Sequence, residues 1–396
     1  MAAKPAMIWN RSPSKASVNR DIGALRRPWA GLCALSVVDG IALLPILEHS
    51  SIGPAAIESG CMSTVARMLL ALVSSCIGLV AQSYTLSCDP WVAWAPAWVA
   101  QEKGMWKRHG IDVQVISFSG CDAAHALTAG KVDFCMAMAG TAVGLAVEDG
   151  ADVVVLGEID WSHGGDKLVV DKGLDVVALR GKRVGIYEDS PAVYMFLAEA
   201  LQAAGLGLDS VQVVVIEDPE SLASQIVAHR LAGVVLYDPF VASALKQGAR
   251  VVATTADYPG VMPEVVVAAR QSIAKMPPTH VTALLRGWID AVEWCQRPEN
   301  EAEFLRIAKA KAFGDEEVEV ADVRRMLDDV RIHDRATLKA RNLGEQGIAA
   351  FLARCEQFAR RHTPEPKPAK GPLFSPQWMR LALGEVEPEV LPSPGK

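Results

Sequence analysis

The sequence lacks the motifs that mark the common hydrolases, zinc proteases and P-loop nucleotide-binding enzymes. It contains no G-x-S-x-G, H-E-x-x-H or G-x-x-x-x-G-K-[ST] pattern. Its eight cysteines form no C-x-x-C pair and no Cys/His ligand spacing. We therefore expect no metal site, no cofactor and no disulfide framework, and we expect a protein that is not an enzyme.

Positive charge is also in short supply. The formal net charge is −7, which argues against a nucleic-acid partner because phosphate backbones need a basic surface. The charge is uneven, with a net of +3 in residues 1–81 and −10 in residues 82–396. Because 51% of the 396 residues are hydrophobic, the chain is long and apolar enough for two or three domains with a sizeable core.

No apolar run reaches the roughly 20 residues that a membrane-spanning helix needs. Residues 62–82 instead combine Arg67, an apolar stretch from Met68 to Ala81 and small polar residues, which is the pattern of a secretory signal peptide. The stretch Val73-Ser-Ser-Cys76 weakly resembles a lipoprotein box and leaves lipid anchoring at Cys76 open. Residues 1–61 show no periodicity. We therefore treat them as an uncertain leader, and our hypothesis is that translation starts at Met62.

Apolar strand-like runs alternate with helix-like runs from Tyr84 onward, which predicts a mainly parallel α/β sheet. A second α/β unit follows, and PEVVVAAR (263–270) is predicted to be a strand that returns to the first unit. The stretch IDWSHGGD (159–166) lies between two strand-like runs, where either a tight hairpin or a ligand-holding crossover fits. The expected organisation is lobe 1 from residues 83–168 and 262–360, lobe 2 from 169–261, and a proline-rich tail from 361–396.

Several segments in the same order resemble one family of proteins. WVAWAPAWVAQEKGMWKRHG (91–110), ALTAGKVDFCMA (126–137), LRGKRVGIY (179–187) and YDPF (237–240) resemble periplasmic substrate-binding proteins for nitrate, sulfonates and taurine. That group also includes binders of thiamine-pyrimidine precursors, and the match covers about residues 84–340. The sequence departs from the family where Asp238-Pro239-Phe240 replaces E-P-[FW] and where Asp189-Ser190 replaces Gly-Ser.

The resemblance implies a type II periplasmic binding protein, an α/β fold with two lobes, two crossovers and C-terminal helices. It also implies a monomer outside the cytoplasm that closes around a small-molecule solute and delivers it to the permease of an ABC importer. It places IDWSHGGD at a crossing between the lobes, in favour of the ligand-holding interpretation.

Ligands of parallel sheets bind beyond the carboxyl ends of the strands, where helix N-termini offer free N–H groups. Turns of this kind, together with the crossover and the residues after later strands, supply our candidate ligand-binding residues. These are Trp91, Trp94, Ser119, Gly120, Gly140, Thr141, Asp160, Trp161, Ser162, Glu188, Asp189, Ser190, Tyr237 and Asp238.

The candidate turns hold many acids and almost no bases, Lys167 being the exception. Two carboxylates facing the site would require a cationic, zwitterionic or amine-bearing ligand, and aromatic walls suit cations well. We therefore place taurine-like zwitterions and aminopyrimidines above nitrate. Two alternatives stay open: an enzyme on the same fold, similar to the fungal pyrimidine synthases, and a sensor or partner-docking module that no longer serves transport.

Overall fold

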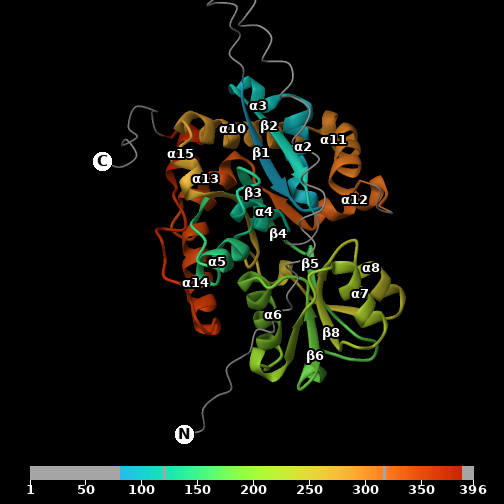
Figure 1. Ribbon diagram of the computed structural model, residues 1–396. Helices are drawn as coiled ribbons and strands as arrows, with labels where there is room; N and C mark the ends of the chain where they lie inside the picture. The colour runs from blue at the N-terminus through green and yellow to red at the C-terminus, as the bar shows by residue number, and fades with distance from the viewer. Residues whose placement is uncertain (1–80, 119–121, 315–317, 386–396) are drawn as a thin grey trace, which may run out of the picture. The chain divides into compact units, whose positions relative to one another are not determined.

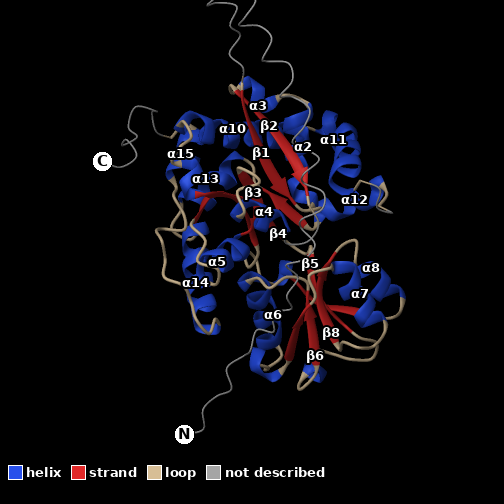
Figure 2. Cartoon of the chain, in the orientation of Figure 1, coloured by secondary structure: helices blue, strands red, loops and turns tan. Residues whose placement is uncertain are grey.

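Two β-sheets and the helices packed on them make up the part of the chain that the structure describes (Figures 1 and 2). The computed structural model describes residues 81–118, 122–314 and 318–385, and these all belong to one compact unit. The expected leader (1–61), nearly all of the expected signal peptide (62–82) and Cys76 lie outside the described residues.

The first sheet, sheet A, has six strands in the order β11-β4-β10-β3-β1-β2. Strands β2 and β3 both run parallel to β1, whereas β10 runs antiparallel to β3 and β4. The sheet is therefore mixed rather than mainly parallel, because the chain re-enters it from the opposite direction. Its strands are β1 (Gln82–Cys88), β2 (Ile111–Ser117), β3 (Phe134–Met138), β4 (Val153–Ser162), β10 (Pro263–Ala269) and β11 (Val330–Ile332).

The second sheet, sheet B, has five strands in the order β7-β6-β8-β5-β9. Strand β6 runs parallel to β7 and β8, and β5 runs antiparallel to β8 and β9. Valine, leucine and isoleucine fill most of the buried positions of β5, β6 and β8, as expected for strands with both faces covered. The strands are β5 (Asp166–Val170), β6 (Arg183–Ile186), β7 (Gln212–Val215), β8 (Gly233–Tyr237) and β9 (Arg250–Thr254).

Two helices that begin beside the later site follow local sequence rules. Helix α6 (Pro191–Ala203) begins after Ser190 with proline in its first turn, where the missing N–H costs nothing. Helix α7 (Pro219–Val227) begins after Asp218, whose carboxylate accepts the backbone N–H of Ser221 at 2.9 Å. The other helices around sheet B and the first half of sheet A are α2 (Ala95–Glu102), α3 (Met105–Arg108), α4 (Asp122–Thr128), α5 (Ala139–Val147) and α8 (Val241–Lys246).

The C-terminal part is helical, as predicted. It comprises α9 (Arg270–Ile273), α10 (Pro278–Cys295), α11 (Glu301–Ala308), the π-helix η7 (Lys309–Phe313), α12 (Val320–Asp328), α13 (Arg335–Leu343), α14 (Ile348–His362) and α15 (Gln377–Leu383). Short 3-10 turns are η2 (Val92–Trp94), η3 (Val177–Leu179), η4 (Leu208–Ser210), η5 (Thr255–Asp257) and η6 (Pro298–Asn300). None of the described helices has the length and hydropathy needed to cross a membrane.

The segment expected to be a proline-rich tail, 361–396, contains packed structure as far as it is described. Phe374 forms an isolated bridge with Val155 of β4, and Trp378 and Met379 of α15 belong to the core. Both residues are buried, with Trp378 7% and Met379 0% exposed. The apolar face of α15 therefore holds this segment against sheet A.

The stretch IDWSHGGD forms the passage from sheet A to sheet B. Residues 159–162 end β4 and Asp166 begins β5. The Ser162 hydroxyl lies 2.7 Å from that of Thr255 and accepts the backbone N–H of Asp166, while Thr255 Oγ1 accepts the N–H of Gly164. Gly164 has a φ of 113°, which L-residues rarely adopt. The polar residues and glycines of this stretch thus build a crossover rather than a hairpin within one sheet.

Candidate functional site

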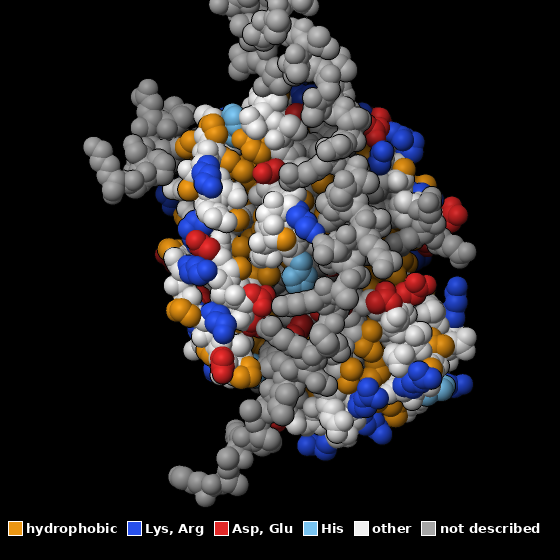
Figure 3. All heavy atoms as spheres, viewed as in Figure 1, with side chains coloured by type: hydrophobic (Ala, Val, Ile, Leu, Met, Phe, Trp, Pro, Cys, Tyr) orange, Lys and Arg blue, Asp and Glu red, His pale blue; other side chains and the backbone are white. Residues whose placement is uncertain are grey.

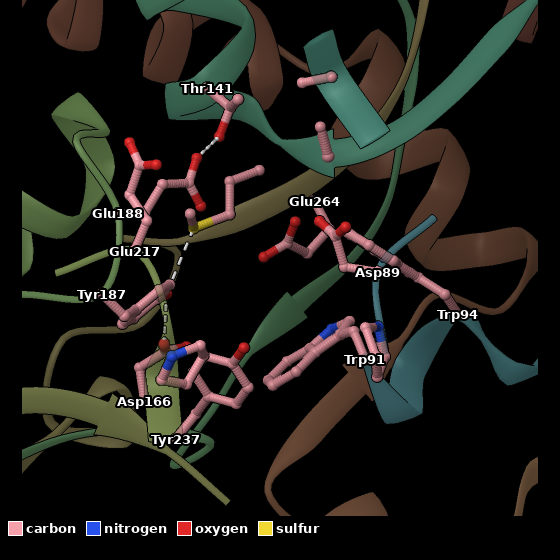
Figure 4. Close-up of a pocket in the computed structure, with 15 residues that line it drawn as sticks. Asp89, Trp91, Trp94, Thr141, Asp166, Tyr187, Glu188, Glu217, Tyr237 and Glu264 are labelled. Atoms are coloured by element: carbon pink, nitrogen blue, oxygen red, sulfur yellow. Dashed lines mark hydrogen bonds between the residues drawn. The ribbon is translucent and has the colours of Figure 1, made fainter. Parts of the chain in front are cut away.

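A pocket lies among the carboxyl ends of strands from both sheets (Figure 4). Its empty space is about 640 Å³ when the solvent at its mouth is included. Its lining combines aromatic rings with five carboxyl side chains. The lining residues are Asp89, Pro90, Trp91, Trp94, Ala124, Ala137, Met138, Thr141, Asp166, Tyr187, Glu188, Glu217, Pro219, Tyr237 and Glu264.

Two tryptophans just after β1 form one wall of the pocket. Trp91 donates its indole N–H to Asp160 Oδ1 at 3.2 Å, and Trp94 in η2 is 4% exposed. Gly165 allows this placement, because a Cβ there would lie 2.7 Å from Trp91 Cη2. Burial raises the pKa of Asp160 to about 8, while the indole hydrogen bond from Trp91 lowers it.

Tyrosines from sheet B form the facing wall. The Tyr237 ring, at the end of β8, packs edge-on against Tyr187 at a centroid distance of 4.8 Å and against Trp91 at 6.0 Å. The Tyr187 hydroxyl donates to Asp166 Oδ1 at 2.6 Å. These contacts hold the aromatic rings as flat apolar surfaces, and the Asp166 carboxyl is hydrogen-bonded to Tyr187.

Helix α5 meets the start of α6 at the edge of the pocket. Thr141 donates its hydroxyl to Glu188, which follows β6. Gly140 makes the close approach possible, since a Cβ there would lie 2.5 Å from Ala192 and 2.6 Å from Ser190 Oγ. Ser190 is fully buried, and its hydroxyl finds no hydrogen-bond partner among the described residues. Glycine at position 140 is therefore needed for packing.

Burial raises the pKa values of four pocket carboxyls, those of Asp89, Asp166, Glu188 and Glu264. Burial raises the pKa of Asp89 and of Glu264 well above the usual values, and the charges of nearby carboxylates add to the effect. Burial, with Glu217 and Asp166 adding to it, raises the pKa of Glu188 to about 7. Perturbed carboxyls gathered in a pocket mark a functional site, because burying them without partners costs stability.

Glu264 is the most isolated of these acids. It lies in β10, in register with Met138 of β3 on one side and Asp160 of β4 on the other. It is 3% exposed, and among the described residues its Oε2 has no hydrogen-bond partner. A buried carboxyl oxygen without a donor is destabilising, so this position is maintained against the stability of the ligand-free protein.

The described lining contains no lysine or arginine. Lys167, next to Asp166 in the sequence, pairs with acids outside the lining: its Nζ lies 2.9 Å from Asp238 Oδ2 and 3.1 Å from Asp329 Oδ2. Acidic side chains also lie on the visible surface near the level of β5 (Figure 3). Within the described residues, no group of three or more His, Cys, Asp or Glu side chains is arranged to hold a metal ion.

The structure brings some of the candidate residues together and places others behind the pocket. Trp91, Trp94, Thr141, Glu188 and Tyr237 line it. Gly140 and Ser190 lie at the α5–α6 contact, Ser162 is in the crossover, and Asp238 pairs with Lys167. Asp189 accepts the Tyr194 hydroxyl at 3.2 Å, Asp160 supports Trp91, and Trp161 packs against His333 and Arg341. Ser119 and Gly120 lie outside the described residues.

Sequence reasoning did not select four acids of the lining: Asp89, Asp166, Glu217 and Glu264. Asp89 follows the first strand, in the same turn as the selected residues Trp91 and Trp94. Glu217 ends the strand-like run VQVVVIE. Glu264 is the one acid in PEVVVAA, and an acid inside an apolar strand is the signal that points to it.

The model of the NMT1-like family matches residues 81–309, more than half of the chain. The chain belongs to the NMT1-like family. This NMT1-like chain is also 31% identical over 145 residues to a Brucella abortus protein that carries a provisional binding-protein name. That alignment covers 36% of this chain and 44% of the relative, so the chain spans less than half of the relative's length.

Solved structures share the fold at low sequence identity. The periplasmic aliphatic sulphonate binding protein SsuA from Escherichia coli has a TM-score of 0.56 at 17% identity, covering 73% of this chain and 95% of that one. The ligand-binding component of an ABC-type import system from Staphylococcus aureus has a TM-score of 0.58 at 15% identity, covering 76% and 99%. The nitrate-binding protein NrtA from Synechocystis scores 0.57 at 15% identity, covering 80% and 93%. These likenesses confirm the predicted two-lobed periplasmic-binding-protein fold.

Proposed function

We propose that this NMT1-like protein binds a small amine-bearing organic solute outside the cytoplasm and delivers it to the permease of an ABC importer. The observation that carries the solute class is the pocket, where five carboxyls meet aromatic walls and no lysine or arginine is present in the described lining. The names of the fold relatives support the transport role. Closure of the lobes around the solute is the expected mode of binding.

The charge of the pocket favours an amine-bearing ring, such as an aminopyrimidine, over a taurine-like zwitterion. A sulfonate needs positive charge or several N–H donors, whereas Asp89, Glu188 and Glu264 offer acceptors. An amine or a protonated ring nitrogen would donate to these oxygens, and its ring would lie against Trp91 or Tyr237. The sulphonate and nitrate named for the fold relatives belong to those proteins.

A binding role also fits the cysteine chemistry better than an enzymatic role. Burial raises the pKa of the Cys88 and Cys135 thiols well above the usual value, so both stay protonated. The thiolate is the nucleophilic form, and neither cysteine lines the pocket. We propose a monomer that is exported by the predicted signal peptide, with lipid anchoring at Cys76 as the alternative to release.

A thermal-shift screen of the full chain tests the proposal. The panel contains nitrate, taurine, alkyl sulfonates, aliphatic amines and aminopyrimidines at equal ionic strength. A ligand present at 100 times its Kd stabilises the folded state by about 2.7 kcal/mol, which raises the Tm visibly. We expect amines or aminopyrimidines to raise the Tm. Stabilisation by nitrate or sulfonates alone would contradict the proposed solute class.

A further inference from the structure

The carboxyls of the pocket form two pairs that come from different sheets. Asp89 follows β1 and Glu264 lies in β10, both in sheet A, whereas Glu188 follows β6 and Glu217 follows β7 in sheet B. Figure 4 shows the Asp89–Glu264 pair on one side of the pocket and the Glu188–Glu217 pair on the other. The fifth acid, Asp166, accepts the Tyr187 hydroxyl, and its charge acts on both Glu188 and Glu264.

Each acid of the Asp89–Glu264 pair has one buried oxygen without a hydrogen-bond donor among the described residues. Among the described residues, neither Asp89 Oδ1 nor Glu264 Oε2 has a hydrogen-bond partner, although both atoms are buried. Glu264, 3% exposed, lines the pocket directly. A buried oxygen that is left without a donor costs free energy, and a group entering the pocket is what would supply the donor.

The Glu188–Glu217 pair lies at the more open end. Glu217 is exposed and Glu188 is half-buried, with Thr141 donating to it. Within the part of the chain that is described, no lysine or arginine is paired with either acid. Each pair therefore presents acceptor oxygens to the same cavity from opposite sides.

The space between the pairs is bounded by aromatic rings. Trp91, Tyr187 and Tyr237 are held edge to face, with Trp91–Tyr237 and Tyr187–Tyr237 centroid distances of 6.0 and 4.8 Å. Such rings suit methylene groups or a flat ring, and their faces attract cations. An apolar segment fits here better than a polar one.

We propose that the solute carries two cationic nitrogen groups joined by an apolar segment, one at each carboxyl pair. The proposal rests on the proposed function and specifies its ligand class as diamines. A ligand with one cation supplies donors to one pair and leaves the other pair without them. A second ammonium group supplies donors and opposite charge to that pair, so the two ends of the ligand contribute separately.

The matched probes are 1,4-diaminobutane, butylamine and 4-aminobutyrate, which share one chain length and differ only in the second end. Isothermal titration of the full chain at pH 7.5 measures each Kd. We expect the diamine to bind at least about tenfold more tightly than butylamine, a typical loss for one charged contact, and 4-aminobutyrate to bind most weakly.

Two variants separate the two ends. In Glu217→Gln, we expect diamine affinity to fall to about that of butylamine, with butylamine itself changed less than about twofold. In Glu264→Gln, both ligands should weaken about tenfold or more. Glu220→Gln is the control, because this substitution removes the same charge from an exposed acid of α7 that lies outside the pocket lining.

The outcomes distinguish the two proposals. Equal affinity for butylamine and the diamine, or an unchanged diamine Kd in Glu217→Gln, would overturn the two-cation ligand while leaving an amine-binding protein. Absence of binding by these amines and by 4-aminopyrimidine would overturn both. The two-ended site would be established by an about tenfold preference for the diamine that is lost in Glu217→Gln and kept in Glu220→Gln.

Discussion

Trp91 Nε1 donates a hydrogen bond of 3.2 Å to Asp160 Oδ1, which joins the turn after β1 to the end of β4. Asp160 is fully buried, and its pKa is raised to about 8 mainly by burial. The indole donor opposes this shift because it stabilises the ionised carboxylate. One side chain thus forms a wall of the pocket and supports an acid behind it.

Trp91→Phe removes this donor and keeps the ring. We expect a loss of about 1–2 kcal/mol in the free energy of unfolding at pH 9, where Asp160 is mostly ionised, and a smaller loss at pH 6. Urea unfolding at both pH values measures the difference. Trp98→Phe, in α2, is the control variant. Equal losses at both pH values would show that the bond does not depend on the charge of Asp160.

Glu264→Gln is expected to stabilise the ligand-free protein and to weaken amine binding. Glutamine keeps the shape of the side chain but removes an unpartnered buried acid that lies in register with Asp160. A gain of about 1 kcal/mol in the free energy of unfolding is the expected size at pH 8. Chemical denaturation without ligand and titration with butylamine give the two readouts. A destabilised variant at pH 8 would indicate that Glu264 has a structural partner.

The stability of the ligand-free protein should fall as the pH rises through about 7. The pKa of Glu188 is raised from 4.5 to about 7 in the folded state, so between about pH 4.5 and pH 7 the folded chain holds a proton that the unfolded chain has released. This contribution is complete below pH 4.5 and is lost by about pH 8. Comparison of Glu188→Gln with the unchanged chain at pH 5 and pH 8 isolates it, and we expect a difference of about 2 kcal/mol.

The affinity for an amine should change in the opposite sense. A cation favours ionised Glu188, so binding at pH 6 must first release its proton, whereas binding at pH 8 needs little release. We expect butylamine or 4-aminopyrimidine affinity, corrected for the ligand's own protonation, to rise by up to about tenfold between pH 6 and pH 8. Titrations in two buffers of different ionisation enthalpy count the protons released at pH 6.5. Net proton uptake there would contradict the cationic ligand.

Lys167→Met tests the two ion pairs that Lys167 forms with Asp238 and Asp329. The lysine Nζ lies 2.9 and 3.1 Å from their carboxylates, and its side chain is only 12% exposed. Its removal leaves two acids beside Trp91 without a counter-charge, and a loss of about 2–3 kcal/mol in unfolding free energy is expected. Lys172→Met, at an exposed position, is the control. A loss below 0.5 kcal/mol would be typical of an exposed surface pair instead.

More of the fold than of the site could be predicted from the sequence. Alternating strand and helix patterns, with Ser190-Pro191 and Asp218-Pro219 at helix starts, indicate the α/β units because these are local effects. The direction of β10 and its place between β3 and β4 are set by long-range pairing. The resemblance to periplasmic binding proteins, rather than composition, gave the two-lobed fold.

Of the acids that sequence reasoning did not select, Glu264 depends on register. Glu264 faces the pocket because β10 pairs antiparallel with β3 and β4, which places Glu264 opposite Met138 and Asp160. Nothing in the local sequence PEVVVAA determines these partner strands. Glu217 lines the pocket because β7 runs parallel beside β6 at the edge of sheet B. Glu217 follows β7 as closely as Glu188 follows β6, and a parallel-sheet rule looks for ligand contacts at both places.

The most direct test of an acidic, amine-binding pocket compares butylamine with butane-1-sulfonate, which have the same chain and opposite charge. Isothermal titration of the full chain at pH 7.5 and low salt measures both Kd values. We expect butylamine to bind at least about tenfold more tightly than butane-1-sulfonate, and added salt to reduce the difference between the two Kd values. Tighter binding of butane-1-sulfonate would contradict it, because five carboxyls line this pocket and no lysine or arginine is present in its described lining.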